Sequence, residues 1–347
     1  MSPYALSIMM SSLAVGTTMT LTSNHWFLAW MGLEFNTLAI IPLMTKNHHP
    51  RATEAATKYF LMQALASALI LFSATMNAWF MGEWEITNMS YPMSATLLTV
   101  ALAMKLGIAP FHLWLPDVLQ GLNLFTCLIL STWQKIAPMI LMIQTHTQLN
   151  TNLLIIMAIM STIIGGWGGL NQTHLRKIMA YSSIAHLGWM TLVLCFMPTL
   201  TTFNLIIYIV MTTVMFMMLM NMSSTTINKM AMSWLKSPTM AASMMIILMS
   251  LGGLPPTTGF IPKWLIIQEM TKQNMIAITT IIALSSLLSL FFYLRMSYSI
   301  SLTTSPNTSN FNSIWRQNNQ NTTILSMTII FSTLMLPITP TMINIMN

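Results

Sequence analysis

Charged residues are scarce in this chain. Only 5% of its 347 residues are charged and 55% are apolar, whereas soluble domains average about 25% charged residues. So few charges cannot cover a water-soluble surface. The apolar residues form long runs, such as residues 153–170, and lack the alternation over about ten residues that a membrane β-barrel strand would show. Since about 20 apolar residues cross a bilayer as a helix, the sequence predicts an all-α, polytopic membrane protein.

Cysteine is nearly absent as well. The two cysteines, Cys127 and Cys195, each lie in an apolar run, and their spacing indicates no disulfide framework, zinc site or iron–sulfur cluster. The sequence also lacks a dinucleotide fingerprint and a haem ligand pair. We therefore expect this chain to bind no cofactor and no metal, and we interpret both cysteines as packing residues.

The N-terminal segment lacks the features of a targeting peptide. Residues 1–21 have neither a basic region followed by an Ala-x-Ala-like end nor an Arg- and Ser-rich amphipathic pattern, so we interpret them as the first membrane span. A net charge of +7 would suggest a nucleic-acid partner in a soluble protein. Here the basic residues flank apolar segments, which indicates membrane orientation instead.

Polar and turn-forming patches divide the chain into about eleven expected membrane helices. We expect a first five-helix repeat in residues 1–145, a second in 150–298, and a polar loop with a final helix in 299–347. The expected spans are 3–21, 25–44, 55–80, 93–121, 124–145, 150–171, 176–196, 199–221, 238–271, 275–298 and 324–345.

With these spans, the basic residues in the loops are distributed unevenly between the two sides of the membrane: nine lie on one side and one lies on the other. Such an asymmetry predicts that the N-terminus lies inside and the C-terminus outside. The basic residues on the inner side are Lys46, Arg51, Lys58, Arg176, Lys177, Lys229, Lys236, Arg295 and Arg316, and Lys272 is on the outer side.

A short pattern recurs in the fourth span of each half. The spans 93–121 and 238–271 both contain Leu-Gly-x-x-Pro, beginning at Leu106 and Leu251, with another proline six or seven residues later. Interruptions at matching positions of two halves are typical of inverted repeats with broken helices. An ordinary proline kink in each span is the alternative interpretation.

Four charged residues lie well away from the ends of the expected spans: Glu34, Lys105, Lys135 and Lys263. A charge at the centre of a bilayer costs about 2.5–3.5 kcal/mol on insertion scales, so a purely structural role is rarely the reason for one. Burial disfavours the charged form of lysine and glutamate alike, which suits both to exchanging protons near neutral pH. The alternatives are static buried ion pairs and lysines that extend to the headgroups.

Two histidines are weaker candidates for a proton relay. His112 lies beside the expected break in span 93–121, which makes it the better of the two. His186 lies on an apolar span, where a hydrogen-bonded core histidine is an equally good interpretation.

Three segments together resemble a known family. They are residues 104–117 (Met-Lys-Leu-Gly-Ile-Ala-Pro-Phe-His-Leu-Trp-Leu-Pro-Asp), 30–34 (Trp-Met-Gly-Leu-Glu) and 252–263. The chain resembles the proton-translocating antiporter-like family, which comprises membrane-arm subunits of respiratory NADH:ubiquinone oxidoreductase and of multisubunit sodium/proton antiporters. The resemblance covers the whole chain and points to the animal mitochondrial form, which has three helices fewer than the family's fourteen.

The resemblance implies a proton channel of two inverted five-helix repeats joined by a polar axis. Glu34 matches the glutamate that partners the broken-helix lysine, Lys105 matches that lysine, Lys135 matches the lysine linking the halves, and Lys263 matches the terminal charged residue. It also implies the mitochondrial inner membrane, with the N-terminus in the matrix and the C-terminus in the intermembrane space. Other membrane-arm subunits and lipids would be partners, while NADH, FMN, iron–sulfur clusters and ubiquinone would be bound by other subunits.

The sequence thus predicts a core membrane-arm subunit that translocates protons for an NADH:ubiquinone reductase. A secondary sodium/proton antiporter is one alternative, but its sodium site would need carboxylates near the breaks, where only Glu34 and Asp117 are available. A scaffold that conducts nothing is the other.

Overall fold

The computed structural model describes residues 2–46, 48–302 and 323–346. In these ranges the chain is helical and contains no strand, and two isolated β-bridges join His25 to Glu85 and His174 to Thr226. Most of the polar loop expected after residue 299, with Arg316, lies outside the described ranges. The chain divides into two units, Met1–Ser161 with Met190–Pro198 and Thr162–Trp189 with Thr199–Asn347, which are considered separately below.

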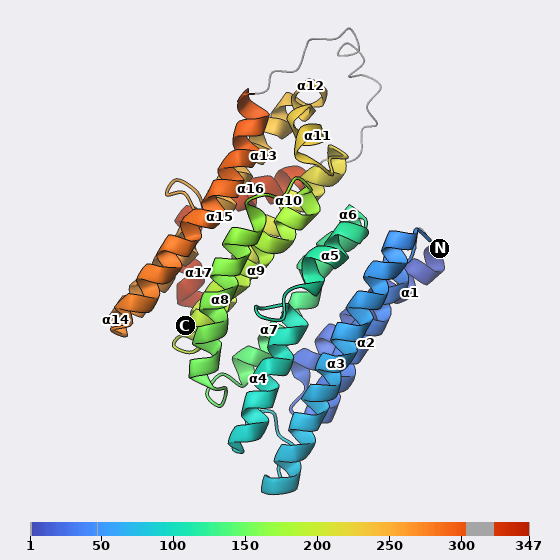
Figure 1. Ribbon diagram of the computed structural model, residues 1–347, viewed down its shortest axis with the longest axis vertical. Coiled ribbons are helices and arrows are strands. Elements are labelled where there is room, and N and C mark those ends of the chain that lie inside the picture. The colour runs from blue at the N-terminus through green and yellow to red at the C-terminus, as the bar shows by residue number, and fades with distance from the viewer. Residues whose placement is uncertain (1, 47, 303–322, 347) are drawn as a thin grey trace. The chain divides into compact units, whose positions relative to one another are not determined.

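The first unit is built from the helices at the start of the chain (Figure 1). They are α1 (Pro3–Thr22), α2 (Trp26–Met44), α3 (Pro50–Met81), α4 (Pro92–Leu106), α5 (Trp114–Gly121), α6 (Leu124–Ser131) and α7 (Trp133–Gln144). Two further helices, α8 (Thr151–Gly169) and α9 (Leu175–Leu194), contribute residues to both units.

The ends of these helices follow local sequence signals. Before α1, the Ser2 hydroxyl accepts a hydrogen bond from the backbone amide of Ala5, and Pro3 is the first helical residue. Proline suits that position because its missing N–H would have no helical partner there. The C-terminal end of α3 is closed by Gly82, whose φ of +75° is readily adopted only by glycine.

Helices α1 and α2 pack closely because glycines face each other across their interface. A Cβ atom added to Gly16 would lie 2.9 Å from the carbonyl oxygen of Gly32, and one added to Gly32 would lie 2.8 Å from that of Gly16. Small residues let helix backbones approach closely in membranes, where the lipid offers no hydrophobic force between helices. Helix α3 in turn packs on α2, α4 and α5, which places α3 beside the site described below.

The second unit holds the remaining helices. They are α10 (Pro198–Asn221), α11 (Ile227–Ala231), α12 (Ser233–Lys236), α13 (Pro238–Gly252), α14 (Phe260–Lys272), α15 (Ile276–Leu302), α16 (Thr323–Leu334), the 3₁₀ turn η2 (Leu336–Ile338) and α17 (Thr339–Met346). Helix α13 packs against α15 and α16, and α14 against α15.

Seven of the described helical segments are long and apolar enough to cross a membrane, or eight if the bent pair at the C-terminal end forms one span. The expected spans 93–121 and 238–271 are each two shorter helices, α4 with α5 and α13 with α14. The protein is therefore an all-α, multi-pass membrane protein, while the number of eleven spans stays a prediction.

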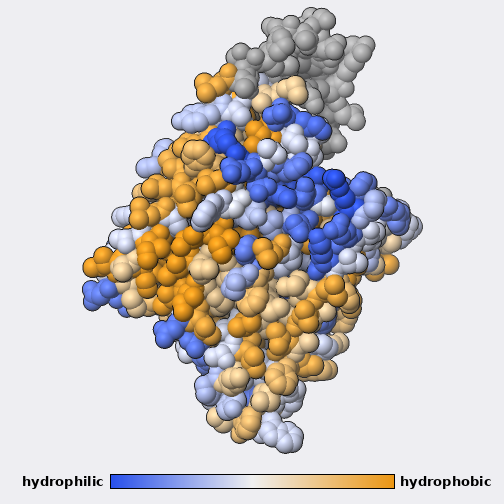
Figure 2. Space-filling model, viewed as in Figure 1, coloured by the Kyte–Doolittle hydropathy of each residue, from blue (hydrophilic) through white to orange (hydrophobic). Residues whose placement is uncertain are grey.

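Large apolar side chains lie on the surface, as expected of a chain that contacts lipid. Figure 2 shows apolar residues over much of the visible face. On α3, Phe72 and Trp79 are 51% and 85% exposed, and on α15 the exposures of Leu284 and Phe291 are 65% and 58%. Apolar surface on this scale marks contact with membrane or with other chains.

Candidate functional site

The first candidate site is built around the break that follows α4. Gly107 adopts a left-handed conformation with φ +76°, and its amide bonds back to the carbonyls of Ala103 and Met104 at 3.0 and 3.3 Å. Ile108 also bonds back to Ala103, as in a Schellman helix end. Because α4 ends here, Lys105 lies in its last turn, and α5 begins only at Trp114.

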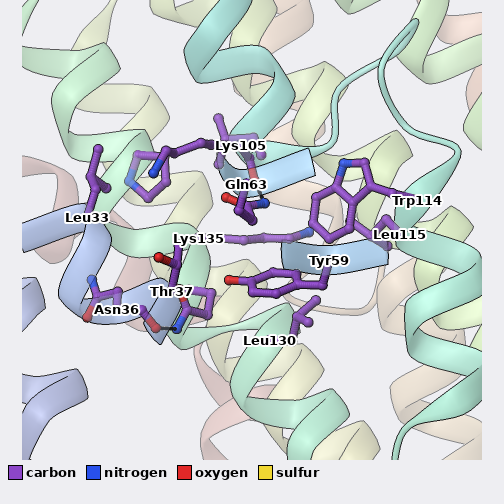
Figure 3. A pocket seen from close by; sticks show the side chains of 13 residues that line it. Leu33, Asn36, Thr37, Tyr59, Gln63, Lys105, Trp114, Leu115, Leu130 and Lys135 are labelled. Carbon is purple, nitrogen blue, oxygen red and sulfur yellow. Dashed lines mark hydrogen bonds between the residues drawn. The ribbon is translucent and has the colours of Figure 1, made fainter. Parts of the chain in front are cut away.

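A cavity beside this break brings two of the expected lysines together. Lys105 and Lys135, which are 6% and 5% exposed, both line it, and Figure 3 shows their side chains directed into it. About 20 Å³ is open to the centre of a water molecule, which is enough for a single water. The other lining residues are Leu33, Asn36, Thr37, Tyr59, Gln63, Leu106, Trp114, Leu115, Leu130, Gln134 and Pro138.

Glu34 is a neighbour of this cavity and is not one of its lining residues. Its carboxylate accepts a hydrogen bond of 3.0 Å from the Thr37 hydroxyl, and Thr37 does line the cavity. Glu34 and Lys105 form no ion pair as close as 4 Å among the described residues.

Several polar atoms around the cavity have no hydrogen-bond partner in the described part of the protein. They are Lys105 Nζ, both side-chain polar atoms of Asn36 and Trp114 Nε1. Buried polar groups are nearly always hydrogen-bonded to protein or to ordered water. A polar cavity of this size with several such atoms around it therefore suits a bound water that could pass protons between side chains.

The break in the second unit has the same backbone form. α13 ends at Gly252, and Gly253 has a φ of +81°, with its amide bonded to the carbonyls of Met249 and Ser250. Leu254 bonds back to Met249. The repeated sequence pattern pairs Gly107 with Gly252, but the structure places Gly253 at the equivalent position because it is the residue that adopts the left-handed conformation.

Lys263 lies on the helix that follows this second break. Its ammonium donates a hydrogen bond of 2.8 Å to the carbonyl oxygen of Gly252. A second, smaller cavity of about 10 Å³ lies beside Lys263. Its lining residues are His186, Trp189, Asn204, Ile207, Tyr208, Met211, Ser250, Leu251, Gly259, Pro262 and Lys263.

The two histidines differ in their surroundings. His186 lines the cavity that holds Lys263, and its ring lies 5.6 Å from that of Tyr208. His112 is buried within the break after α4 but lines neither lysine cavity. The sequence favours His112 because it lies beside the break, whereas in the structure His186 is the one that lines a cavity together with a lysine. The relay role of each stays a prediction.

Sequence reasoning missed the uncharged polar residues of the first cavity. Asn36, Tyr59, Gln63 and Gln134 all line it, and none was singled out. Asn36 is two residues from Glu34, and Gln134 is next to Lys135. Amide side chains inside apolar spans were the signal that could have found them, because such groups are costly in a membrane unless they are hydrogen-bonded.

The fold and these cavities define a class of protein: a multi-pass helical membrane protein with lysines beside the breaks in its helices. Residues 23–289 match the family described as NADH:quinone oxidoreductase/Mrp antiporter, transmembrane, and residues 290–343 match the NADH dehydrogenase subunit 2 C-terminus. The chain belongs to the NADH:quinone oxidoreductase/Mrp antiporter family.

Curated relatives resemble the whole chain. NADH-ubiquinone oxidoreductase chain 2 of Polypterus ornatipinnis is 58% identical and that of Xenopus laevis 57%, over 99% and 98% of this chain and 99% of each relative. A chain of respiratory complex I from Thermus thermophilus with bound aureothin has the same fold, with a TM-score of 0.82 at 24% identity over 97% of this chain and 80% of that one. These similarities confirm the resemblance that the sequence motifs indicated.

Proposed function

We propose that this chain is a core membrane-arm subunit of a proton-pumping NADH:ubiquinone oxidoreductase. It moves protons through Glu34, Lys105, Lys135 and Lys263, while NADH oxidation and ubiquinone reduction take place on cofactors held by other subunits. Its relatives, which are similar over nearly their whole length, are named NADH-ubiquinone oxidoreductase chain 2, and these names support membership of this complex. Other membrane-arm subunits, including antiporter-like neighbours, and membrane lipids are its partners.

The observation that carries the proton-transfer role is the burial of Lys105 and Lys135 in one cavity. A water bound in this cavity would connect the two side chains and could carry a proton between them. Glu34 is the acidic residue beside the cavity, and an opposite charge that approaches a lysine favours its protonated form. A change in the distance between Glu34 and Lys105 would therefore shift a proton between the two lysines.

The second half of the path rests on Lys263, with His186 as a relay beside it. The assignment of Lys135 as the residue that links the two halves is supported by the sequence resemblance alone. His112 keeps a weaker relay role at the first break.

The proposed setting is the mitochondrial inner membrane, with eleven spans, the N-terminus in the matrix and the C-terminus in the intermembrane space. The animal relatives and the sorting of basic residues support this orientation. Two inverted five-helix repeats are supported by the matching backbone of the two breaks. Each proton moved outward works against about 2.3 kcal/mol per 100 mV of membrane potential.

Replacement of Lys105 by methionine tests the proposal. Methionine keeps much of the length and apolar volume of the side chain but cannot carry a proton. In the assembled complex, Lys105→Met should lower the number of protons pumped per electron, whereas Lys58→Met, which changes a lysine with 43% exposure, should not. An unchanged ratio in Lys105→Met would contradict the assignment of Lys105.

A sodium/proton antiporter is the alternative. Sodium would need several oxygen ligands near the breaks, and in the described part of the chain no three His, Cys, Asp or Glu side chains gather into a cluster. Sodium-dependent proton movement by the complex in the absence of NADH would favour this alternative.

A further inference from the structure

The two breaks have the same backbone but differ in what closes them. In each, the left-handed glycine is followed by six residues before the next helix begins, Leu113 and Gly259 being the last of these. The two following amides bond back in the same pattern. Helices leave their last four carbonyls without helical partners, so the carbonyls nearest each break need donors from elsewhere.

In the second unit that donor is an ammonium group. Lys263 donates to the carbonyl of Gly252 at 2.8 Å, and its side chain covers Gly253, where an added Cβ would lie 2.9 Å from Lys263 Cδ. A cation at the C-terminal end of a helix also opposes the negative end of the helix dipole. Lys263 thus closes the broken helix α13 and lines a cavity with the same side chain.

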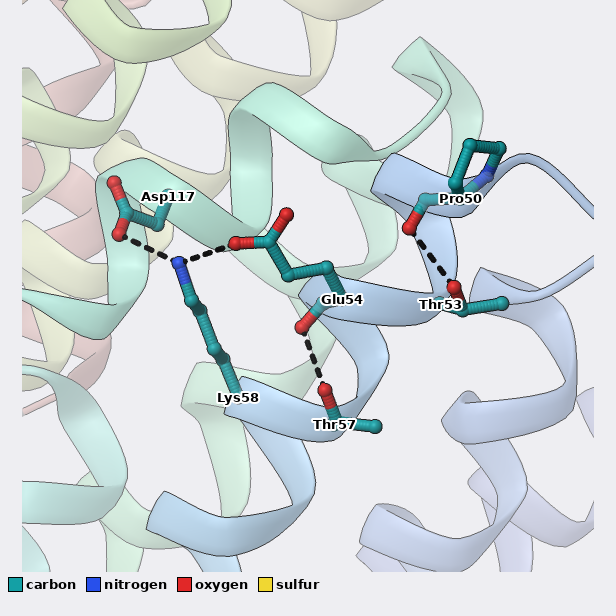
Figure 4. A network of polar contacts seen from close by, with 6 residues as sticks. All are labelled: Pro50, Thr53, Glu54, Thr57, Lys58 and Asp117. Carbon is teal, nitrogen blue, oxygen red and sulfur yellow. Dashed lines mark hydrogen bonds and ion pairs between the residues drawn. The ribbon is translucent and has the colours of Figure 1, made fainter.

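In the first unit the residue at the equivalent position cannot do this. Asp117 and Lys263 are each the fourth residue of the helix that follows the break. Asp117 follows Pro116, and Lys263 follows Pro262. A carboxylate has no proton to donate to a carbonyl. Asp117 is half exposed and instead accepts a hydrogen bond of 3.2 Å from Lys58, which also pairs with Glu54 (Figure 4).

A donor for the end of α4 comes from another helix, and it bonds to a carbonyl one residue earlier than in α13. Lys105 is two residues before the left-handed glycine, whereas Gly252 directly precedes it. Gln63, a residue of α3 that is only 4% exposed, donates from Nε2 to the carbonyl oxygen of Lys105 at 3.3 Å. The same side chain lines the cavity that holds Lys105 and Lys135. A neutral amide closes the end of α4 in every protonation state of the lysines, so Lys105 does not have to close it.

We propose that Gln63 is a positioning residue for proton transfer, which holds the last turn of α4 so that the Lys105 ammonium stays in the cavity and is not used as a helix cap. This inference rests on the proton-transfer role proposed for Lys105. It makes the two halves unequal: the Lys105 ammonium has no hydrogen-bond partner among the described residues, whereas the Lys263 ammonium is held by the helix end that it caps.

The experiment compares Gln63→Leu and Gln63→Glu with Gln268→Leu, an exposed glutamine of α14, in the assembled complex. The first measurement is hydrogen–deuterium exchange of peptides covering residues 103–113 and 249–259. Loss of one hydrogen bond should make exchange in 103–113 about threefold to tenfold faster in Gln63→Leu and leave 249–259 unchanged. Gln268→Leu should change neither.

The second measurement is the pH profile of proton pumping. In Gln63→Glu, the new side chain can still donate to the Lys105 carbonyl while it is protonated. Once ionised, it cannot donate and would draw the Lys105 ammonium toward itself. Gln63→Glu should therefore pump best at acidic pH and lose pumping as the pH rises, while Gln63→Leu should be slowed several-fold at every pH.

Unchanged exchange in residues 103–113 of the Gln63 variants would overturn the inference, whatever pumping does. Faster exchange with normal pumping and a normal pH profile would overturn it as well, because Gln63 would then hold the backbone without positioning Lys105. If Gln63→Leu does not assemble, the pH profile of Gln63→Glu decides alone. Failure of the function proposed for Lys105 is recognised separately, by normal pumping in Lys105→Met.

Discussion

The single hydroxyl proton of Thr37 is shared between the carboxylate of Glu34, at 3.0 Å, and the backbone carbonyl of Glu34, at 2.9 Å. Thr37 lines the lysine cavity and Glu34 does not. The threonine therefore connects the acidic residue to the cavity wall. This hydrogen bond restricts the orientation of the carboxylate beside the cavity.

Thr37→Val should weaken this connection without altering the shape of the side chain. Loss of a hydrogen bond worth about 1 kcal/mol leaves the Glu34 carboxylate less well held, so proton pumping per complex should fall about threefold to tenfold at neutral pH. The matched control is Thr18→Val, which changes an exposed threonine of α1 whose hydroxyl bonds only to the Val15 carbonyl among the contacts described. Equal pumping in the two variants would show that the Thr37 hydroxyl is not needed.

Alanine substitutions at two left-handed glycines distinguish the free-energy cost of a strained backbone from the effect of displacing the Lys263 side chain. Gly253→Ala and Gly82→Ala each place a Cβ in a conformation that costs about 1–2 kcal/mol, and both should lower the thermal midpoint of the complex. Nothing lies within 4 Å of a Cβ at position 82, whereas at position 253 it would collide with the Lys263 side chain. Only Gly253→Ala should therefore also lower pumping. Normal pumping in a stably assembled Gly253→Ala complex would show that the contact between Lys263 and the helix end is dispensable.

The ion pairs that join Lys58 to Glu54 and Asp117 should contribute little to stability. The three side chains are 43%, 63% and 50% exposed, and exposed pairs are weakened by water and by salt. Asp117→Asn should leave the melting temperature of the complex unchanged at physiological ionic strength. A clear drop that persists in high salt would mean that these charges are shielded from solvent in the assembled complex.

The helices and the buried lysines Lys105 and Lys135 were predictable from the sequence because both depend on local rules. Apolar runs of membrane-spanning length indicate helices wherever they occur, and a lysine inside such a run stands out by its cost. The glycines at the ends of α4 and α13 were also visible, since glycine followed by proline marks a helix end. The repeated pattern aligns Gly107 with Gly252, but the left-handed residue of the second break is Gly253, and the backbone of the folded chain alone distinguishes these two adjacent glycines.

The sequence by itself determined that this protein is a multi-pass helical membrane protein with lysines inside its spans, because hydrophobicity and charge act residue by residue. Only the tertiary structure decided that Lys105 and Lys135 share a cavity, that Gln63 closes the end of α4, and that Lys263 of α14 closes the end of α13. These contacts join residues far apart in the chain, as with the 42 positions between Gln63 and Lys105. They depend on the packing and rotation of whole helices, which no short stretch of sequence specifies.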